Sequence, residues 1–172
     1  MSNTALLIID LQYDYFPGGA YPLWQADEIR DKIVTAIGKA KAKGILPVHI
    51  QHIADPNQGL SPFFNEGTHG AEIVAPIMEA APDAHVVVKH YADGFHETHL
   101  ENVLHKYGIE KLLVCGMMTQ NCVTHTSISK AAEKYDVAIV SDLCTTVTEL
   151  LHLIALNAVS TRMKLVSSAE AF

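Results

Sequence analysis

Three side chains that can do chemistry together stand next to separate apolar runs of the sequence. Asp10 and Lys89 each come directly after such a run, and Cys122 stands a few positions beyond another. A cysteine attacks carbonyl carbon as its thiolate, a carboxylate can take the thiol proton and later return it, and an ammonium can orient the carboxylate and favour the thiolate. A thiol, an acid and an amine at one place are therefore suited to acyl transfer, such as hydrolysis of an amide.

Each of these residues also has an ordinary structural explanation when it is taken alone. An aspartate often ends a first parallel strand, a lysine after a strand often extends along the surface, and a cysteine often fills space in a core. The other two cysteines, Cys115 and Cys144, are assigned that structural role, one within an apolar run and the other in a loop after one. No cysteine spacing indicates a disulfide framework or a zinc site. Only the combination of the three residue types favours a catalytic site.

The elements that must position these residues are predicted from hydrophobic periodicity. Six short runs rich in Val, Ile and Leu are continuous rather than alternating, which is typical of strands buried on both faces; they cover residues 5–9, 45–50, 85–88, 111–115, 137–140 and 163–166. Helical spacing is found between them, at about residues 25–43, 97–107, 120–134 and 148–160. Residues 54–72, with several Gly and Pro, are expected to form a long loop.

This alternation predicts one α/β domain over residues 1–172, a three-layer, doubly wound, Rossmann-like sandwich. Its sheet is expected to be six-stranded and mostly parallel, with helices on both faces. In such sheets ligands bind beyond the carboxyl ends of the strands, where the strand order reverses. We therefore expect Asp10, Lys89 and Cys122 to meet at that edge. A helix start at Cys122 is expected to lower the pKa of its thiol and to leave backbone N–H groups free for an oxyanion.

Composition limits the classes of partner. Twelve Lys and Arg against nineteen Asp and Glu give 12 − 19 = −7, without a basic cluster, so no nucleic-acid partner is expected. The apolar run before Asp10 has only five residues, too few for a signal peptide or a membrane span, which predicts a cytoplasmic protein with no membrane partner. The low charged fraction of 18% and the nearly all-apolar segment 150–159 predict a homo-oligomer, a dimer or larger.

The motifs around these residues resemble those of a known family. Three segments carry the resemblance: Asp10-Leu11-Gln12-Tyr13-Asp14-Tyr15, Val88-Lys89 followed by Phe95 and Thr98-x-Leu100, and Gly116-Met117-Met118-Thr119-x-x-Cys122-Val123. They are similar to the patterns D-x-Q-N-D-F, K…F…T-x-L and G-x-x-T-x-x-C-V of the isochorismatase-like cysteine hydrolase superfamily. That superfamily includes nicotinamidases, N-carbamoylsarcosine amidohydrolases and ureidoacrylate hydrolases. Tyrosine replaces both Asn and Phe of the first pattern.

The resemblance implies a site and a mechanism. Cys122 would be the nucleophile that forms a thioester, Asp10 the general base and acid, and Lys89 the group that orients the carboxylate and stabilises the thiolate. It also implies a non-proline cis peptide bond between Met117 and Met118, and an oxyanion hole made by the backbone N–H groups of Met118 and Cys122.

The region after the second predicted strand departs from the nicotinamidase pattern, which has an Asp-x-His and a further His for a metal. His49 and His52 are three residues apart on an extended strand, so they should point to opposite faces. No metal and no cofactor is therefore expected, although His52, Asp55 and His69 could still meet through folding of the loop. His52 is instead predicted to be a hydrogen-bonding group of the pocket wall.

The function expected from these observations is hydrolysis of a C–N bond in a small linear amide or ureide. Besides Lys89, basic side chains are scarce near the predicted site, and no arginine lies in the loops that should form the pocket, which favours a neutral substrate. The candidate lining residues are His52 and the aromatic side chains near the strand ends, Phe16, Tyr21, Trp24, Tyr91 and Phe95. The alternatives are a nicotinamidase, a vinyl-ether hydrolase, which the presence of Cys122 disfavours, and a catalytically silent oligomeric module. A receiver domain is excluded because Lys89 stands where that class requires an acid.

Overall fold

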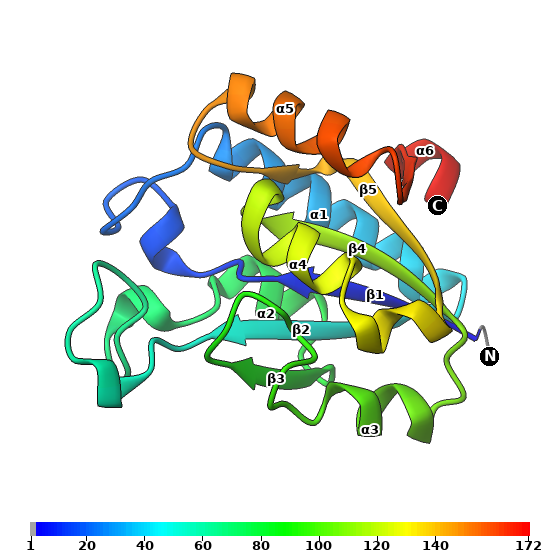
Figure 1. Cartoon of the computed structure of the whole chain (residues 1–172), viewed down its shortest axis with the longest axis horizontal. Helices are drawn as coiled ribbons and strands as arrows, with labels where there is room; N and C mark the ends of the chain where they lie inside the picture. Colours follow the sequence, from blue (N-terminus) through cyan, green and yellow to red (C-terminus); the bar gives the residue numbers. More distant parts are fainter. Residues whose placement is uncertain (1–2) are drawn as a thin grey trace.

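The computed structural model describes residues 3–172 as a six-stranded, all-parallel sheet between layers of helices (Figure 1). The strand order is β3-β2-β1-β4-β5-β6. The strands are β1 (Thr4–Ile9), β2 (Leu46–His52), β3 (His85–Lys89), β4 (Lys111–Met117), β5 (Asp136–Thr145) and β6 (Lys164–Val166). The predicted α/β sandwich is thus confirmed, and every strand pair in the sheet is parallel.

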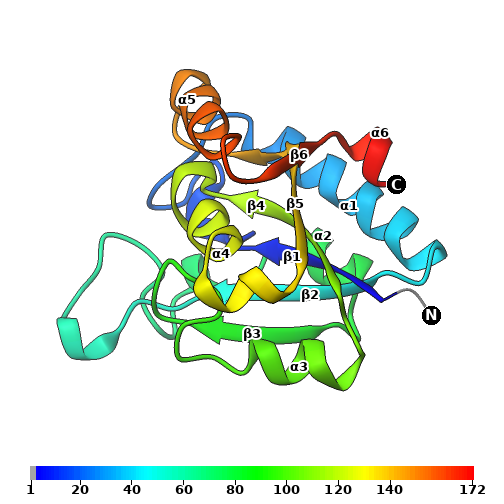
Figure 2. The same cartoon turned by 45° about the vertical axis from the view of Figure 1, so that its right-hand side comes forward.

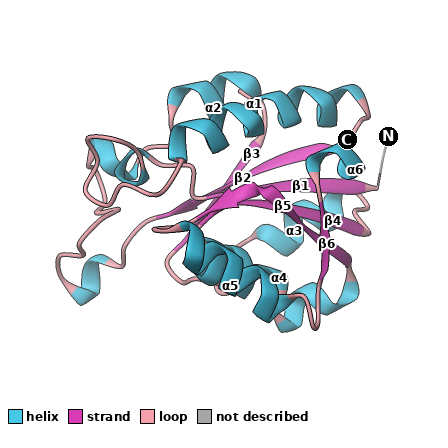
Figure 3. Cartoon of the chain, turned by 90° about the horizontal axis from the view of Figure 1, so that it is seen from above, coloured by secondary structure: helices cyan, strands magenta, loops and turns pink. Residues whose placement is uncertain are grey.

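The helices lie on both faces of the sheet. They are α1 (Ala26–Ala42), α2 (Ala75–Ala80), α3 (Leu100–Lys106), α4 (Thr124–Ser127), α5 (Glu149–Val159) and α6 (Ser168–Ala171). In the view from above, α1 and α2 cover one face, whereas α3, α4 and α5 cover the other (Figure 3). Figure 2 shows β6 beyond β5 at the end of the sheet and α6 as the helix that follows β6. None of the described helices is long and apolar enough to cross a membrane.

The longest helix, α1, illustrates why the local sequence folds as it does. Ile29, Ile33 and Ile37 recur at helical spacing and are buried against the sheet. Acidic residues occupy its first turn and lysines its last, which suits the helix dipole. Gly44, with a φ of 70°, follows the last turn in the left-handed conformation that ends helices.

Two predicted elements were wrong in extent. The helix expected over residues 120–134 is broken into a π-helical turn (Thr119–Val123), the short α4 and a 3-10 turn (Lys130–Lys134). Hydroxyl groups in this segment bond to nearby backbone, as Ser127 Oγ does to the Val123 carbonyl, and such bonds compete with a continuous helix. Strand β5 continues to Thr145, so Cys144 lies in a strand and not in a loop. The short helix α2 was not predicted.

Strands β1 and β4 are neighbours at the point where the strand order reverses. Ile9 of β1 is in register with Gly116 of β4, and Gly116 has a φ of 118°. A Cβ atom on Gly116 would lie 2.1 Å from the Ile9 carbonyl oxygen. Only glycine therefore allows the two strands to approach so closely, and this edge is where ligands bind in such sheets.

Candidate active site

The ammonium group of Lys89 is the centre of the site. It lies 3.0 Å from Asp10 Oδ2, 2.8 Å from His52 Nδ1, 3.1 Å from the Tyr91 carbonyl oxygen and 3.2 Å from Cys122 Sγ. An ammonium has three N–H donors, so four acceptors compete for them. The structure therefore brings together the three residues that the sequence singled out, with the side chain of His52 and the backbone of Tyr91.

Each of the three residues is positioned by the end of a strand. Asp10 directly follows β1 with a φ of 55°, and its N–H donates to the Ile50 carbonyl of β2. Lys89 is the last residue of β3, and Cys122 lies on the π-helical turn after β4. The Met117–Met118 peptide bond between β4 and this turn is cis, as the resemblance implied. All three side chains are almost fully buried.

The turn that carries Cys122 is held from α5. His152 Nδ1 lies 2.8 Å from Thr119 Oγ1, and both side chains are buried. The hydroxyl of Thr124 also donates to the Thr119 carbonyl. The first residue of the turn is thus fixed through its side chain and its backbone, so the position of Cys122 depends on α5 as well as on β4.

The electrostatics favour a neutral thiol in the resting site. Burial and the Asp10 carboxylate raise the pKa of Cys122 above its ordinary value, and the Lys89 ammonium opposes them only in part. Burial acts to lower the pKa of Lys89, but Asp10 and Cys122 outweigh it, so the pKa is raised and the amine stays charged. The lowered thiol pKa expected from the sequence is therefore wrong in direction, because the site is sealed from water and contains a carboxylate.

One carboxylate oxygen of Asp10 is left without a hydrogen bond. Oδ2 accepts from Lys89, whereas Oδ1 is buried and has no partner among the described residues. A buried, unpartnered carboxylate oxygen is costly and calls for a functional explanation. Oδ1 is a free acceptor in the same sealed space as the Cys122 thiol, which suits a group that must take a proton.

His52 is held as a neutral acceptor. Burial and the charge of Lys89 lower the pKa of His52 to about 4. Its backbone is fixed by Gln12, whose amide nitrogen donates to the His52 carbonyl at 2.7 Å and whose amide oxygen accepts from the His52 N–H at 2.8 Å. His52 therefore contributes a lone pair to Lys89 and no charge of its own.

Asp10, His52 and Cys122 also form a possible metal-ligand group. One ligand atom from each lies within 4.8 Å of the other two. The ammonium nitrogen of Lys89 bonds to the same three side chains, so a cation already occupies the space between them. A metal would have to displace Lys89, and we conclude that the resting arrangement does not fit one. Asp55 and His69 are engaged elsewhere, with Asn57 and with Glu72, so the alternative set with His52 is not assembled.

The aromatic wall beside the site consists of Tyr15, Phe63 and Phe64, which the sequence analysis missed. The Tyr15 ring lies 4.5 Å from Phe64 and 5.4 Å from Phe63 between ring centroids, and Phe64 lies 5.9 Å from the His52 ring. Burial, with the charges of Asp10 and Cys122, raises the pKa of Tyr15, so its phenol stays neutral beside these groups. The sequence did contain a signal for Tyr15, because this residue is the last one of the motif that begins at Asp10.

A single carboxylate holds the wall in place. Asp14 accepts from the backbone N–H of Phe64 at 2.8 Å and of Ala20 at 3.1 Å, which ties the segment after β1 to the loop after β2. Gly70 packs directly on this carboxylate, where a Cβ would lie 2.1 Å from Asp14 Oδ1.

Several predicted lining residues lie elsewhere. The Phe16 ring packs under the Arg30 guanidinium of α1, and the Phe95 ring stacks on Tyr135, which precedes β5 at the opposite edge of the sheet. Each ring therefore packs on a neighbouring side chain, and the assignment of Phe16 and Phe95 to the pocket stays a prediction. Tyr91 contributes only its carbonyl, because its ring is partly exposed and packs on His96; Tyr21 packs on Phe63, and Trp24 lies near His152.

Comparisons with known proteins identify the family and support the fold. The family model for the Isochorismatase domain matches residues 4–171. An uncharacterized isochorismatase family protein of Bacillus subtilis is 34% identical over 146 residues, which are 85% of this chain and 79% of that protein. A streptothricin hydrolase of Streptomyces noursei is 34% identical over 123 residues, 72% of this chain and 42% of that enzyme. A pyrazinamidase of Pyrococcus horikoshii, crystallised with zinc, has a TM-score of 0.85 at 28% identity, covering 96% of this chain and 99% of that chain.

The fold, the site at the strand ends and these matches together define the class of protein, a family of hydrolases built on a parallel sheet between helices. The chain belongs to the isochorismatase family.

Proposed function

We propose that the protein is a metal-independent cysteine amidohydrolase acting on a small, uncharged, linear amide or ureide. The observation that carries the proposal is the sealed contact of Lys89 Nζ with both Asp10 and Cys122, at 3.0 and 3.2 Å. The resting thiol, the unpartnered Asp10 oxygen and the charged amine supply a nucleophile, a base and a fixed positive charge.

In the first half-reaction, Cys122 Sγ attacks the substrate carbonyl carbon as Asp10 takes the thiol proton. The carbonyl oxygen becomes an oxyanion, which the backbone N–H groups of Met118 and Cys122 would receive. The C–N bond then breaks, Asp10 gives its proton to the departing nitrogen, and ammonia or an amine leaves a thioester on Cys122.

In the second half-reaction, a water molecule attacks the thioester while Asp10 accepts one of its protons. The C–S bond breaks, the carboxylic acid is released, and the proton returns from Asp10 to the Cys122 sulfur. Lys89 keeps its proton throughout, because its raised pKa follows from the carboxylate and sulfur that it contacts. Its role is to orient Asp10 and to offset negative charge on sulfur.

The charges around the site support a neutral substrate. Lys89 donates to protein acceptors, and the two arginines of the chain lie away from the triad, with Arg30 against Phe16 and Arg162 after α5. A substrate carboxylate would find no free cation among the residues described around the triad. The aromatic wall also suits flat amides, so nicotinamide remains the second candidate substrate.

The test is release of ammonia, with mass spectrometry of the products, for the neutral compounds butyramide, succinamide, acetylurea and nicotinamide. Succinamate is the charged counterpart of succinamide. We expect turnover of at least one neutral compound, at least tenfold preference for succinamide over succinamate if that pair is hydrolysed, and loss of all turnover in Cys122→Ala.

The matched control is Cys144→Ser, which changes a buried cysteine in β5 whose thiol donates to the Val140 carbonyl and whose sulfur accepts from the Gly116 backbone N–H, contacts that a serine hydroxyl can also make. This variant should keep wild-type turnover. Hydrolysis that survives Cys122→Ala would refute the assignment of the nucleophile, and failure of the wild type on every amide and ureide would favour the silent-module alternative.

A further inference from the structure

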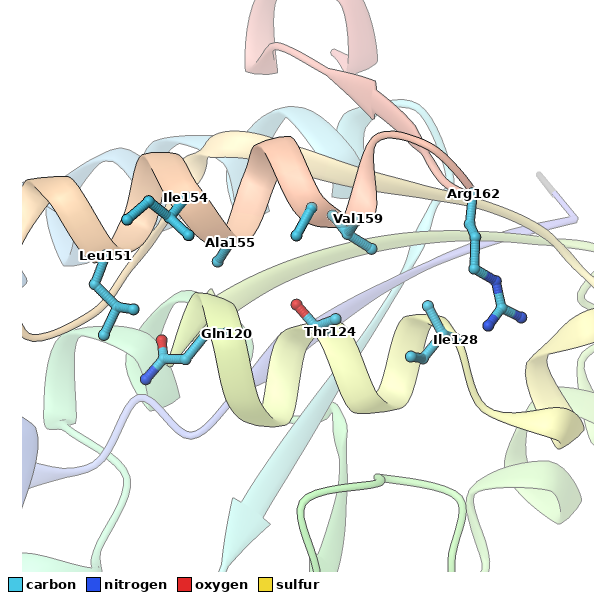
Figure 4. A pocket seen from close by; sticks show the side chains of 9 residues that line it. Gln120, Thr124, Ile128, Leu151, Ile154, Ala155, Val159 and Arg162 are labelled. Atoms are coloured by element: carbon cyan, nitrogen blue, oxygen red, sulfur yellow. The ribbon is translucent and has the colours of Figure 1, made fainter.

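The outer face of α5 is apolar although it faces away from the sheet. Leu150, Leu153 and Ile154 are 68%, 55% and 55% exposed. Beside them runs a groove of about 380 Å³ between α5 and the nucleophile turn with α4 (Figure 4). It is lined mainly by apolar side chains, including Ile128, Leu151, Ile154, Ala155 and Val159. An exposed apolar patch of this kind usually marks an interface.

The charges at the two ends of this surface are of opposite sign. Glu149 begins α5, and Arg162 follows its last turn and closes one end of the groove (Figure 4). Within the described residues, neither side chain takes part in an ion pair. The helix is eleven residues long, or about 16 Å at 1.5 Å per residue, so the two charges lie roughly one helix length apart.

We propose that this surface binds a second copy of the chain, with the two α5 helices antiparallel across a two-fold axis at the level of Ala155 and Leu156, midway between Glu149 and Arg162. A two-fold interface must be complementary to itself. Here the same helix carries the protruding Leu150 and Leu153 and borders the groove that would receive them. Reversing one copy brings Glu149 of each chain towards Arg162 of the other, at both ends of the interface. This complementarity selects a second copy over an unrelated partner.

The proposal does not depend on the proposed function, because its test is the state of association. Light scattering and sedimentation at micromolar concentration and about 50 mM salt should give twice the 18.8 kDa mass of the chain, or an even multiple. Low salt is chosen because surface charge pairs are screened as ionic strength rises.

Charge reversal tests the orientation. Glu149→Arg and Arg162→Glu should each weaken the dimer at least tenfold, because each places like charges opposite one another twice. The double variant should recover to within about threefold of the wild-type dissociation constant. Leu153→Asp should give a monomer, whereas Lys32→Glu, on α1 at the other face of the sheet, should change nothing. Circular dichroism and unfolding of each variant check that it is folded.

Three results would overturn the proposal. They are a wild-type monomer, an assembly whose dissociation constant is unchanged by Leu153→Asp, and single charge reversals that are not rescued in the double variant. The last result would show that the helices meet in another orientation.

Discussion

Lys89 is a fully buried amine whose charge is matched by a fully buried carboxylate. Its ion pair with Asp10 has no exposed part on either side chain. Removing one member of such a pair strands the other charge, which typically costs about 3–5 kcal/mol. Loss of activity in a Lys89 or Asp10 variant would therefore combine an effect on the chemistry with an effect on stability, whereas replacement of Cys122, a neutral thiol, leaves no charge without its partner.

The thiol itself gives a direct prediction. Iodoacetamide should modify Cys122 before Cys115 and Cys144, because the latter two lie inside sheet strands, whereas Cys122 lies on a turn next to loops. Since the pKa of Cys122 is raised, the rate should keep rising as pH increases above 8.5, the usual value for a free thiol. Peptide mapping over a pH series measures both effects. Equal labelling of the three cysteines would contradict the assignment, and a plateau below pH 8.5 would contradict the electrostatics.

Metal removal is the second prediction at this scale. Because Lys89 Nζ fills the space between Asp10, His52 and Cys122, prolonged chelation should leave turnover within about 20% of its starting value, an allowance that we choose for assay scatter. Added zinc should not increase it. Activity that disappears on chelation and returns with zinc would show that a metal can displace the amine.

At the scale of the elements, the contact of β4 with β1 is the most sensitive to substitution. Gly116→Ala would place a methyl group 2.1 Å from the Ile9 carbonyl, in a conformation that L-residues rarely adopt. We expect a loss of more than about 3 kcal/mol in the free energy of unfolding, since both overlap and backbone strain are added. Denaturant titration measures it.

The matched control is Gly38→Ala in α1. Apart from its chain neighbours and the backbone of its own helix, no atom lies within 4 Å of the Cβ that this change adds, and alanine is the better helix former by about 0.8–1.0 kcal/mol. This variant should be more stable than the wild type. An unchanged free energy of unfolding in Gly116→Ala would show that β1 and β4 can move apart without loss of stability.

The elements divide into those that the sequence predicts and those that it does not. The strands and α1 follow from continuous apolar runs and helical periodicity, and the strand ends at Asp10 and Lys89 follow from them. The break at Thr119–Val123 does not, because residues 120–134 have a plausible helical pattern and the outcome depends on hydroxyl-to-backbone bonds and on the contact of Thr119 with His152. The sequence analysis missed the rings of the aromatic wall for a similar reason. Tyr15 and Phe64 meet only because Asp14 joins two loops that are distant in sequence.

At the scale of the whole molecule, stability should depend on pH through a buried histidine. The folded state holds the pKa of His52 at about 4, whereas an unfolded histidine titrates near 6.5. Between these values the unfolded chain binds a proton that the folded chain excludes. The contribution is therefore complete above about pH 6.5 and is lost as pH falls towards 4.

His52→Asn tests this effect, because an asparagine oxygen can replace Nδ1 as an acceptor for Lys89 and does not titrate. Chemical denaturation at pH 7 and pH 5 should show that the wild type loses more stability than the variant over this interval. Burial also lowers the pKa values of His49 and His152, so part of the pH dependence should remain in the variant. Equal losses in the two proteins would place the titrating group elsewhere.

The enclosure of Cys122 has a kinetic consequence. Its side chain is 2% exposed, and Asp10 and Lys89 are fully covered, so any reagent reaches sulfur only during an opening of the surrounding loops. The alkylation rate then equals the intrinsic rate multiplied by the fraction of time that the site is open. Alkylating agents of increasing width would measure how wide each opening is, and the narrowest agent that no longer reacts would set an upper limit on the width of the natural substrate.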